Sequence, residues 1–326
     1  MCNMHNSLIL YMKKKEKIII SGISGQDSNF IVNQLNSKFD IIGLTRKINN
    51  KNNKNNKNNK NKIFKIIKTN YSLIEIKKII KKFKPVAIYN MAGQSNPDSS
   101  WKKPSITIFS IVNITLNFLE AIISINKKIK FFNSSTSEIY SKKKQIINEN
   151  TKIEPENPYA CAKACAHNLV ITYRKNYKIF AVNGILFNHE SHLKDNKFLL
   201  KKLISESIQV LSKKKSNILL QSKYHVRDIS HAKDTVRAII KIMNSRFNED
   251  FIIASGESRS ISEICKIVCN IVGINDKKVD FIDKYNKKFT YKIANNSKIK
   301  KKLNWKPQYS FEKMVKEMFI YDSKKY

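Results

Sequence analysis

The sequence predicts an α/β fold: a Rossmann-like doubly wound parallel sheet with a smaller α+β C-terminal domain. Three observations lead to this prediction. Short apolar runs alternate with amphipathic helical patterns as far as Asn183, which is typical of a parallel sheet covered by helices on both faces. A glycine-containing turn directly follows the first apolar run. Beyond about residue 186 the alternation loosens, which indicates a second unit with a different arrangement.

The first predicted strand, Lys17–Ser21, leads into the turn Gly22-Ile23-Ser24-Gly25-Gln26-Asp27. Apolar residues then recur at helical spacing, so a helix is expected to follow. A strand, a glycine turn and a helix in this order are typical of a dinucleotide site, because small residues let backbone N–H groups approach a pyrophosphate. The third glycine usual in such turns is Ser28 here, so the prediction depends mainly on the position of the turn after the first strand.

The remaining elements of the larger unit follow from the periods of strands and helices. Strands are predicted at 40–44, 63–67, 86–90, 129–133 and 179–183, and helices at 72–83, 105–125 and 158–177. The stretch 48–62 is almost pure Lys and Asn and cannot bury apolar area, so it is predicted to be a disordered insertion. Residues 12–186 are therefore expected to form a dinucleotide-binding domain.

The C-terminal part, residues 187–326, is predicted to be mainly a substrate-binding domain. Some of its segments can pair with the parallel sheet of the first domain. It is expected to cap the carboxyl ends of the strands, where ligands of such sheets bind. Its predicted helices span 198–211, 229–243, 261–272 and 311–321, and its predicted strands span 217–220 and 251–254.

Length and composition indicate a globular protein, since 326 residues that are 41% hydrophobic can bury a large core. The 62 Lys and Arg against 25 Asp and Glu give a net charge of +37, which raises nucleic-acid binding as a hypothesis. The lysines are scattered through every segment without interleaved aromatic residues, so no specific nucleic-acid site is expected. A basic surface does favour an anionic substrate.

The cysteines and the N-terminus indicate a cytoplasmic chain. Two pairs of cysteines lie four residues apart in apolar helical runs, without further ligands at metal-binding spacing, so buried thiols and no metal site are expected. The apolar stretch 7–11 is too short for a membrane span or a secretory core. The cysteines are Cys2, Cys161, Cys165, Cys265 and Cys269.

Tyr159 and Lys163 are the residues most indicative of chemistry. At this spacing, on a predicted helix, they share one face, so the ammonium can favour the phenolate and make Tyr159 a base. This pair alone indicates hydride transfer. Thr136 and Glu138 stand at the end of the strand before that helix. The carboxylate of Glu138 is a second base, which an elimination requires.

Arg46 and Lys47 follow the second predicted strand, where an acidic residue would bind the 2′-hydroxyl of NAD. Two cations at this place favour the additional 2′-phosphate of NADP instead. The alternative is that Arg46 and Lys47 belong to a solvated, lysine-rich rim and bind no phosphate.

These motifs resemble those of the extended short-chain dehydrogenase/reductases, a group of NAD-dependent epimerases and dehydratases, and more narrowly those of the GDP-mannose 4,6-dehydratase family. The resemblance spans residues 17 to about 320, and Asn188-His189-Glu190-Ser191 is its most specific segment. The other matching segments are 22–27, 88–95, 135–140, 157–160 with Lys163, 183–187, 227–228 with 231–234, and 303–307.

The resemblance implies a hydro-lyase without net redox change that produces GDP-4-keto-6-deoxy-mannose. Tyr159, supported by Lys163, would deprotonate the hydroxyl on sugar carbon 4 as a hydride passes to NADP. Glu138 would remove the proton on carbon 5 while water leaves carbon 6, which then receives the hydride. Thr136 would orient the oxygen on carbon 4.

The resemblance also implies binding residues and partners. GDP-mannose or a related nucleotide sugar is the expected substrate, and a homo-oligomer, dimer or tetramer, is the expected assembly. The cofactor residues would be Gly22, Ser24, Gly25, Gln26, Asp27, Arg46, Asn70, Tyr71, Ala92, Gln94, Tyr159, Lys163 and His189. The substrate residues would be Ser95, Asn188, Lys202 and Arg227.

The chain departs from the family pattern at several positions. Asn70 replaces an aspartate that accepts from adenine, although an amide oxygen can also accept that bond. The segment 192–195 replaces a proline and two arginines, and the Arg-Pro diphosphate motif is missing near 285–288. The four predicted reacting groups are all retained.

Two alternatives remain open. One is another nucleotide-sugar dehydratase, epimerase or reductase, although Glu138 argues against a simple 4-epimerase, which needs no base at carbon 5. The other is a catalytically decayed, basic binding protein.

Overall fold

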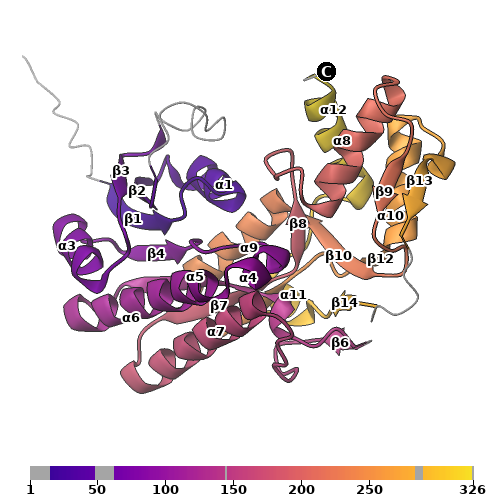
Figure 1. Cartoon of the computed structure of the whole chain (residues 1–326). Coiled ribbons are helices and arrows are strands. Elements are labelled where there is room, and N and C mark those ends of the chain that lie inside the picture. Colours follow the sequence, from indigo (N-terminus) through magenta and orange to yellow (C-terminus); the bar gives the residue numbers. More distant parts are fainter. Residues whose placement is uncertain (1–14, 48–61, 144, 283–288, 325–326) are drawn as a thin grey trace, which may run out of the picture.

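The computed structural model describes residues 15–47, 62–143, 145–282 and 289–324. The described chain forms two lobes, a larger one around an extended sheet and a smaller one that contains α8, α10 and α12 (Figure 1). The predicted insertion 48–62 lies outside the described residues except for Lys62, and so does Cys2.

The larger lobe is built on seven strands in the order β11-β7-β5-β4-β1-β2-β3. Every neighbouring pair is parallel, so the predicted doubly wound sheet is confirmed. The strand β11 returns to this sheet from the C-terminal half and pairs with β7. The bounds are β1 (Glu16–Ser21), β2 (Phe39–Thr45), β3 (Lys65–Lys68), β4 (Ala87–Asn90), β5 (Lys130–Thr136), β7 (Ala181–Leu186) and β11 (Phe251–Ile253).

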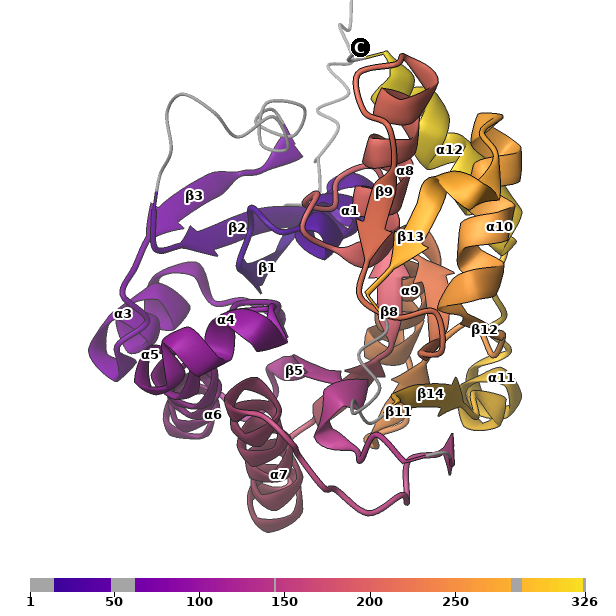
Figure 2. The ribbon, with the colours of Figure 1, turned by 45° about the vertical axis from the view of Figure 1, so that its right-hand side comes forward.

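Helices cover both faces of this sheet because the apolar residues of the central strands are buried on both faces. One cluster joins the sheet to α1, α9 and α11, and a second joins it to α3, α6 and α7. Figure 2 gives a second view of this arrangement. The bounds are α1 (Gln26–Leu35), α3 (Leu73–Phe83), α6 (Ile114–Ile125), α7 (Pro158–Tyr177), α9 (Ala232–Asn244) and α11 (Ser297–Leu303).

The predicted helix 105–125 is continuous but not uniform. It consists of α5 (Pro104–Ile108), a π-helical turn (Phe109–Asn113) and α6, and the short helix α4 (Pro97–Lys102) precedes it. Among the described residues, Pro104–Ile125 is the one helical stretch long and apolar enough to cross a membrane, and half of it is buried. The buried half includes Phe118 and Leu119 in the core beneath the sheet, and the core helix of a folded domain has the same composition.

A row of polar side chains crosses the middle of the buried sheet. The Ser21 hydroxyl donates to Asn90 Oδ1 at 2.8 Å, Asn90 Nδ2 to Asn133 Oδ1 at 3.1 Å, and Asn133 Nδ2 to Asn183 Oδ1 at 2.9 Å. Asn183 Nδ2 completes the row by donating to the carbonyl of His167 at 3.1 Å. These buried amides are thus hydrogen-bonded to each other, which offsets the cost of removing them from water.

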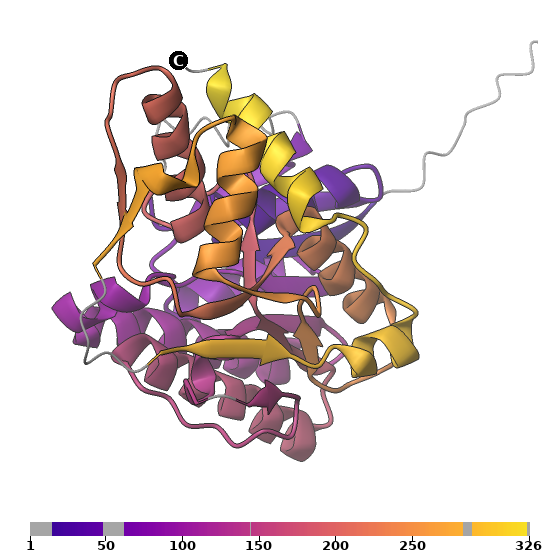
Figure 3. The ribbon, with the colours of Figure 1, turned by 90° about the vertical axis from the view of Figure 1, so that its right-hand side faces the viewer.

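The smaller lobe packs three helices around its own apolar core (Figure 3). Its helices are α8 (Leu199–Leu211), α10 (Ile261–Val272) and α12 (Phe311–Ser323). A mixed sheet, which includes β10, β12 and β14, joins the two lobes. The strands outside the large sheet are β6 (Ile146–Ile147), β8 (Asn188–Glu190), β9 (Ile218–Leu220), β10 (Val226–His231), β12 (Ser258–Ser260), β13 (Val279–Phe281) and β14 (Tyr291–Ala294).

Two predictions are corrected by the fold. The helix predicted at 229–243 begins only at Ala232, because 226–231 pairs as strand β10 and His231 Nδ1 caps the helix by accepting from Lys233 N at 2.9 Å. Cys161 and Cys165 are exposed rather than buried, because they lie on the outer face of α7. The predicted burial of Cys265 and Cys269 is confirmed.

Candidate active site

A cavity of about 960 Å³ opens where the carboxyl ends of the central strands meet the smaller lobe. This is the edge at which ligands of doubly wound sheets bind. The described residues that line it are Gly22, Ser24, Gly25, Gln26, Asp27, Ser28, Thr45, Arg46, Lys47, Tyr71, Met91, Ala92, Gly93, Gln94, Ser95, Pro97, Ser134, Ser135, Thr136, Ser137, Glu138, Tyr159, Lys163, Leu186, Phe187, Asn188, His189, Leu193, Lys194, Asp195, Lys197 and Phe198.

The glycine turn lies against the loop that follows β4. Gly22 has a φ of +66°, and a Cβ there would lie 2.8 Å from the carbonyl oxygen of Met91, so only glycine fits. Gly25 N donates to the Gly22 carbonyl at 2.9 Å. The Ser28 hydroxyl donates to the same carbonyl at 2.9 Å. The residue that replaces the third glycine therefore braces the turn, and the backbone at the start of α1 stays open to an anion.

The start of α1 is tied to the segment around β8. His189 Nε2 lies 3.0 Å from Asp27 Oδ2, and the Ser191 hydroxyl donates to Gln26 Oε1 at 2.7 Å. Burial alone would raise the pKa of Asp27, but the charges of His189 and Lys194 and the hydrogen bond from His189 lower it. The predicted cofactor residues Gln26, Asp27 and His189 thus form one hydrogen-bonded group, although His189 is distant from the other two in sequence.

Three of the predicted cofactor residues follow β2 and β3: Arg46, Asn70 and Tyr71. Arg46 and Tyr71 line the cavity, and the Tyr71 hydroxyl accepts from Gly22 N at 3.3 Å. Burial raises the pKa of Tyr71 to about 12, while the bond from Gly22 and the charge of Arg46 act in the other direction. Asn70 lies outside the described lining, and its Oδ1 accepts from Ser72 N at 2.7 Å.

The loop after β4 contributes Ala92, Gln94 and Ser95 to the lining. The Gln94 side chain folds back on this loop: its amide nitrogen donates to the Asn96 carbonyl, and its oxygen accepts from Asn96 N at 3.1 Å. The loop is therefore shaped by its own side chains.

Tyr159 is placed by the start of α7. Asn157 Oδ1 accepts from Ala160 N at 2.8 Å, and Pro158 occupies the first helical position, so the helix begins with Tyr159 facing the cavity. The side chain of Tyr159 is 7% exposed. Burial raises its pKa, a hydrogen bond with Thr136 lowers it, and the charge of Glu138 raises it. The phenol is thus neutral and adjacent to both predicted partners.

Lys163 lies one turn further along α7 and reaches the end of β5. Its Nζ donates to the Ser134 carbonyl at 2.6 Å and lies 3.4 Å from the Ser134 hydroxyl. Burial lowers its pKa to about 8. The ammonium is therefore held by β5, and its predicted influence on the Tyr159 phenol stays a prediction.

Glu138 stands on a short 3₁₀ turn, Ser137–Ile139, directly after β5. The Thr136 hydroxyl oxygen caps this turn by accepting from Glu138 N at 3.2 Å. The side chain of Glu138 is 23% exposed, and its Oε1 lies 3.8 Å from the ammonium of Lys292. The structure thus brings Thr136, Glu138, Tyr159 and Lys163 together around one part of the cavity.

The predicted substrate residues divide into two groups. Ser95 and Asn188 line the cavity, whereas Arg227 and Lys202 do not belong to its described lining. Arg227 donates to the carbonyls of Val226 at 3.0 Å and Thr290 at 3.1 Å, and burial lowers its pKa while the nearby charge of Glu138 raises it.

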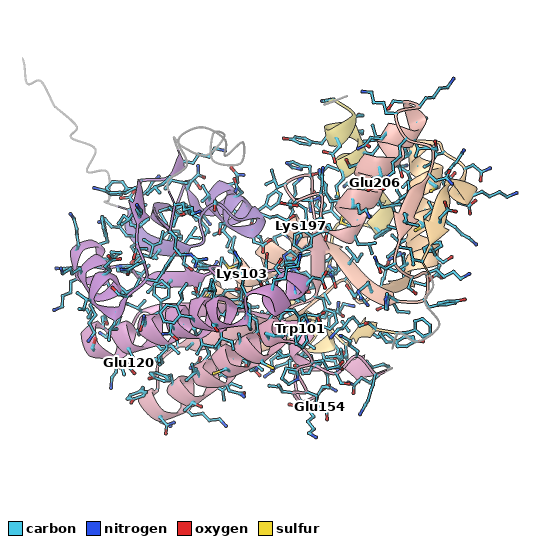
Figure 4. All side chains as sticks on the ribbon, in the orientation of Figure 1. Trp101, Lys103, Glu120, Glu154, Lys197 and Glu206 are labelled. Carbon is cyan, nitrogen blue, oxygen red and sulfur yellow. The ribbon has the colours of Figure 1, made fainter. Side chains whose placement is uncertain are left out.

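Lys202 lies on α8 in the smaller lobe. It donates to the Leu219 carbonyl at 3.1 Å and lies 3.8 Å from Glu206, which is labelled in Figure 4. The binding roles of Lys202 and Arg227 stay predictions.

Two cations of the cavity were not among the predicted site residues. Lys194 donates to the His189 carbonyl at 3.2 Å and lies over the Phe198 ring at 4.4 Å, and Lys197, labelled in Figure 4, lies on the same loop. Their only signal in the sequence is that they follow Asn188-His189-Glu190-Ser191. In a lysine-rich chain this signal is weak.

The fold and the site define the class. A parallel sheet with a glycine turn after β1, a Tyr-x-x-x-Lys helix beside β5 and a second lobe over the strand ends is the arrangement of an extended short-chain dehydrogenase/reductase. Solved structures share this fold. The chain is similar to a UDP-glucose 4-epimerase from Thermotoga maritima, with a TM-score of 0.84, 20% identity, and coverage of 95% of this chain and 99% of the other.

A second solved structure is a dTDP-glucose 4,6-dehydratase from Bacillus anthracis in complex with NAD, with a TM-score of 0.82 and 20% identity over 95% of this chain and 97% of the other. The family is shown by sequence. The model of the GDP-mannose 4,6 dehydratase family matches residues 19–318, and the chain belongs to this family.

Relatives named GDP-mannose 4,6 dehydratase are similar over nearly the whole chain. GDP-mannose 4,6 dehydratase 2 of Caenorhabditis elegans is 30% identical, with 95% of this chain and 90% of the relative covered. The human GDP-mannose 4,6 dehydratase is 31% identical, with 94% and 91% covered. The matched length thus includes both lobes.

Proposed function

We propose that this chain is a GDP-mannose 4,6-dehydratase that uses NADP. The observation that carries the proposal is the adjacency of two bases, Tyr159 and Glu138, in one cavity of a chain that belongs to this family. A carboxylate beside the tyrosine supports an elimination in addition to hydride transfer. The retained set of reacting groups argues against a decayed binding protein.

The residues of the cavity fit a nicotinamide dinucleotide. The glycine turn and the start of α1 line the cavity and suit a pyrophosphate, and Tyr159 and Lys163 line the same cavity and would meet the nicotinamide ribose. When bound, the cofactor accepts a hydride from sugar carbon 4 and returns it to carbon 6.

The side chains of the chain perform the proton transfers. Tyr159 takes the proton of the carbon 4 hydroxyl, while Thr136 hydrogen-bonds the same oxygen. The carbonyl thus formed acidifies the hydrogen on carbon 5, which Glu138 removes as its carboxylate. Tyr159, now protonated, donates to the departing carbon 6 hydroxyl, which leaves as water. As the hydride returns to carbon 6, carbon 5 takes up a proton from Glu138, which exchanges with solvent. Lys163 holds the ribose and, by its charge, favours the phenolate during the first step.

The test is a direct assay of the purified protein with GDP-mannose and NADP. Mass spectrometry should detect a sugar nucleotide that has lost one water. Folded protein that binds the cofactor but yields no dehydrated product contradicts the proposal.

The rival within the same fold is a 4-epimerase, which exchanges no hydrogen at carbon 5. A dehydratase in D₂O should incorporate solvent deuterium at carbon 5, because the proton removed by Glu138 is replaced from solvent. A product without deuterium at this carbon, and with unchanged mass, would favour the epimerase.

NADP rather than NAD is supported by Arg46, which follows β2 and lines the cavity with Lys47. We expect Arg46→Ala to weaken NADP binding about tenfold and to leave NAD binding unchanged, because it removes a charge-assisted bond to the 2′-phosphate. Titration of both cofactors measures the effect. Lys128→Ala is the control, because Lys128 is an exposed cation just before the amino end of β5 and outside the described lining of the cavity. Equal loss of NAD and NADP binding would contradict the assignment.

A homo-oligomer is supported by exposed apolar side chains on α5 and the π turn. Ile106 is 60% exposed and Phe109 65% exposed, and Trp101, labelled in Figure 4, is exposed on the neighbouring α4. Apolar side chains grouped in this way are typical of a surface that binds another chain. We expect Phe109→Lys to shift the protein toward monomer in analytical ultracentrifugation, whereas Phe64→Lys, which changes an exposed phenylalanine elsewhere, should not. A wild-type monomer would contradict the proposal.

A further inference from the structure

The middle of β14 carries a lysine that is fully buried. Lys292 is 0% exposed and lies opposite Arg227 in the parallel pairing of β14 with β10. A buried ammonium is unfavourable unless hydrogen bonds and opposite charges compensate it. The groups that surround Lys292 therefore indicate the role of its charge in the structure.

The ammonium of Lys292 binds both ends of the turn that carries Glu138. Its Nζ donates to the Ser137 carbonyl at 2.8 Å and to the Tyr140 carbonyl at 3.1 Å. These two residues flank Glu138 and Ile139, so the two bonds hold the 3₁₀ turn against β14. A lysine has three donors, which leaves one N–H for a further acceptor.

The carboxylate of Glu138 lies near the same ammonium. Its Oε1 lies 3.8 Å from Lys292 Nζ, within the range of an ion pair. Burial lowers the pKa of Lys292, and the charge of Glu138 acts against this. The other charges that act on Lys292 are Arg227 and Lys142, which lower its pKa, and Glu156, which raises it.

We infer that Lys292 is a positioning residue for the elimination step: its two bonds to the turn and its charge hold the Glu138 carboxylate toward carbon 5 of the bound sugar. The inference rests on the proposed function. A general base acts only within hydrogen-bond reach of the proton that it removes. A displacement of about 1 Å can cost about a hundredfold in rate, so a fixed turn matters for the reaction. Lys292 is not in the described lining of the cavity, and it therefore acts through Glu138.

This arrangement separates the two halves of the reaction. The first oxidation depends on Tyr159, which stands on α7, whereas the bonds of Lys292 go to the turn after β5. Loss of Lys292 should therefore slow proton removal at carbon 5 and leave the first hydride transfer unchanged.

The experiment compares Lys292→Met, which removes the donors and the charge, with Lys292→Gln, which keeps an uncharged donor. Lys298→Met is the matched control, because Lys298 also donates to a backbone carbonyl, that of Asp250 at 2.7 Å, and pairs with a carboxylate, Glu249 at 2.9 Å, outside the cavity. The readouts are the near-ultraviolet absorbance of the reduced nicotinamide in a single turnover, and the isotope effect of substrate deuterated at carbon 5.

We expect Lys292→Met to lower kcat about ten- to a hundredfold, with KM unchanged, a larger carbon 5 isotope effect and an unchanged rate of cofactor reduction. Lys292→Gln should lie between this variant and the wild type and also serves if the Met variant does not fold. Lys298→Met should keep the wild-type isotope effect. An unchanged isotope effect in both Lys292 variants, or equal slowing of cofactor reduction, overturns the inference. If wild-type protein forms no dehydrated product, it is the proposed function that fails instead.

Discussion

Glu138→Gln is expected to stop the formation of dehydrated product while the first oxidation continues. The amide has nearly the shape of the carboxylate but cannot accept the proton of carbon 5, so turnover should fall about a hundred- to ten-thousandfold. Reduced nicotinamide should form and persist, because the hydride taken from carbon 4 has no acceptor at carbon 6 until water has left. Single-turnover absorbance together with mass spectrometry of the product measures both effects.

The controls for this variant test whether the loss of activity is specific to the carboxylate of Glu138. NADP binding should be unchanged, since Glu138 is not one of the residues predicted to bind the cofactor. Glu154→Gln changes a carboxylate outside the described lining, labelled in Figure 4, and should retain full activity. Wild-type turnover by Glu138→Gln would show that another group removes the proton.

Tyr159→Phe is expected to stop the reaction one step earlier. The ring and its packing at the start of α7 remain, but the proton of the carbon 4 hydroxyl has no acceptor, so we expect a fall of about a hundred- to ten-thousandfold in turnover. Unlike Glu138→Gln, this variant should form no reduced nicotinamide.

The absence of reduced cofactor distinguishes the two roles in one measurement. Tyr89→Phe is the matched control, since Tyr89 is also a buried tyrosine, on β4 and outside the described lining. Its activity should be retained. If Tyr159→Phe reduced the cofactor at the wild-type rate, the base of the first step would have to be another group.

The large sheet was predictable because its signals are local. Each central strand is a short apolar run, and each covering helix shows its own apolar spacing, so the order of elements follows directly. Tyr159 and Lys163 were also predictable, since their spacing along one helix is a property of neighbouring residues. The glycine turn was recognised by its position after β1, although Ser28 departs from the usual pattern.

The mixed sheet between the lobes was not predictable in the same way. Its strands are short and half polar, and their pairing joins segments far apart in sequence, as for Arg227 with Lys292. In sequence, Lys292 is one more lysine in a lysine-rich chain, and its burial results from tertiary pairing alone. Lys202 shows the reverse case: the resemblance pointed to it, but α8 directs its amine to the Leu219 carbonyl.

The row of amides through the large sheet has a consequence for how the catalytic groups are aligned. Asn90, Asn133 and Asn183 are direct neighbours on β4, β5 and β7, and Thr136 follows Asn133 by three residues on β5. A slip of one residue between strands would turn these amides to the opposite face and leave them without partners in an apolar layer. The row thus allows a single register. Because Thr136 ends the same strand and Glu138 stands on the turn directly after it, this register also fixes where the turn meets the cavity.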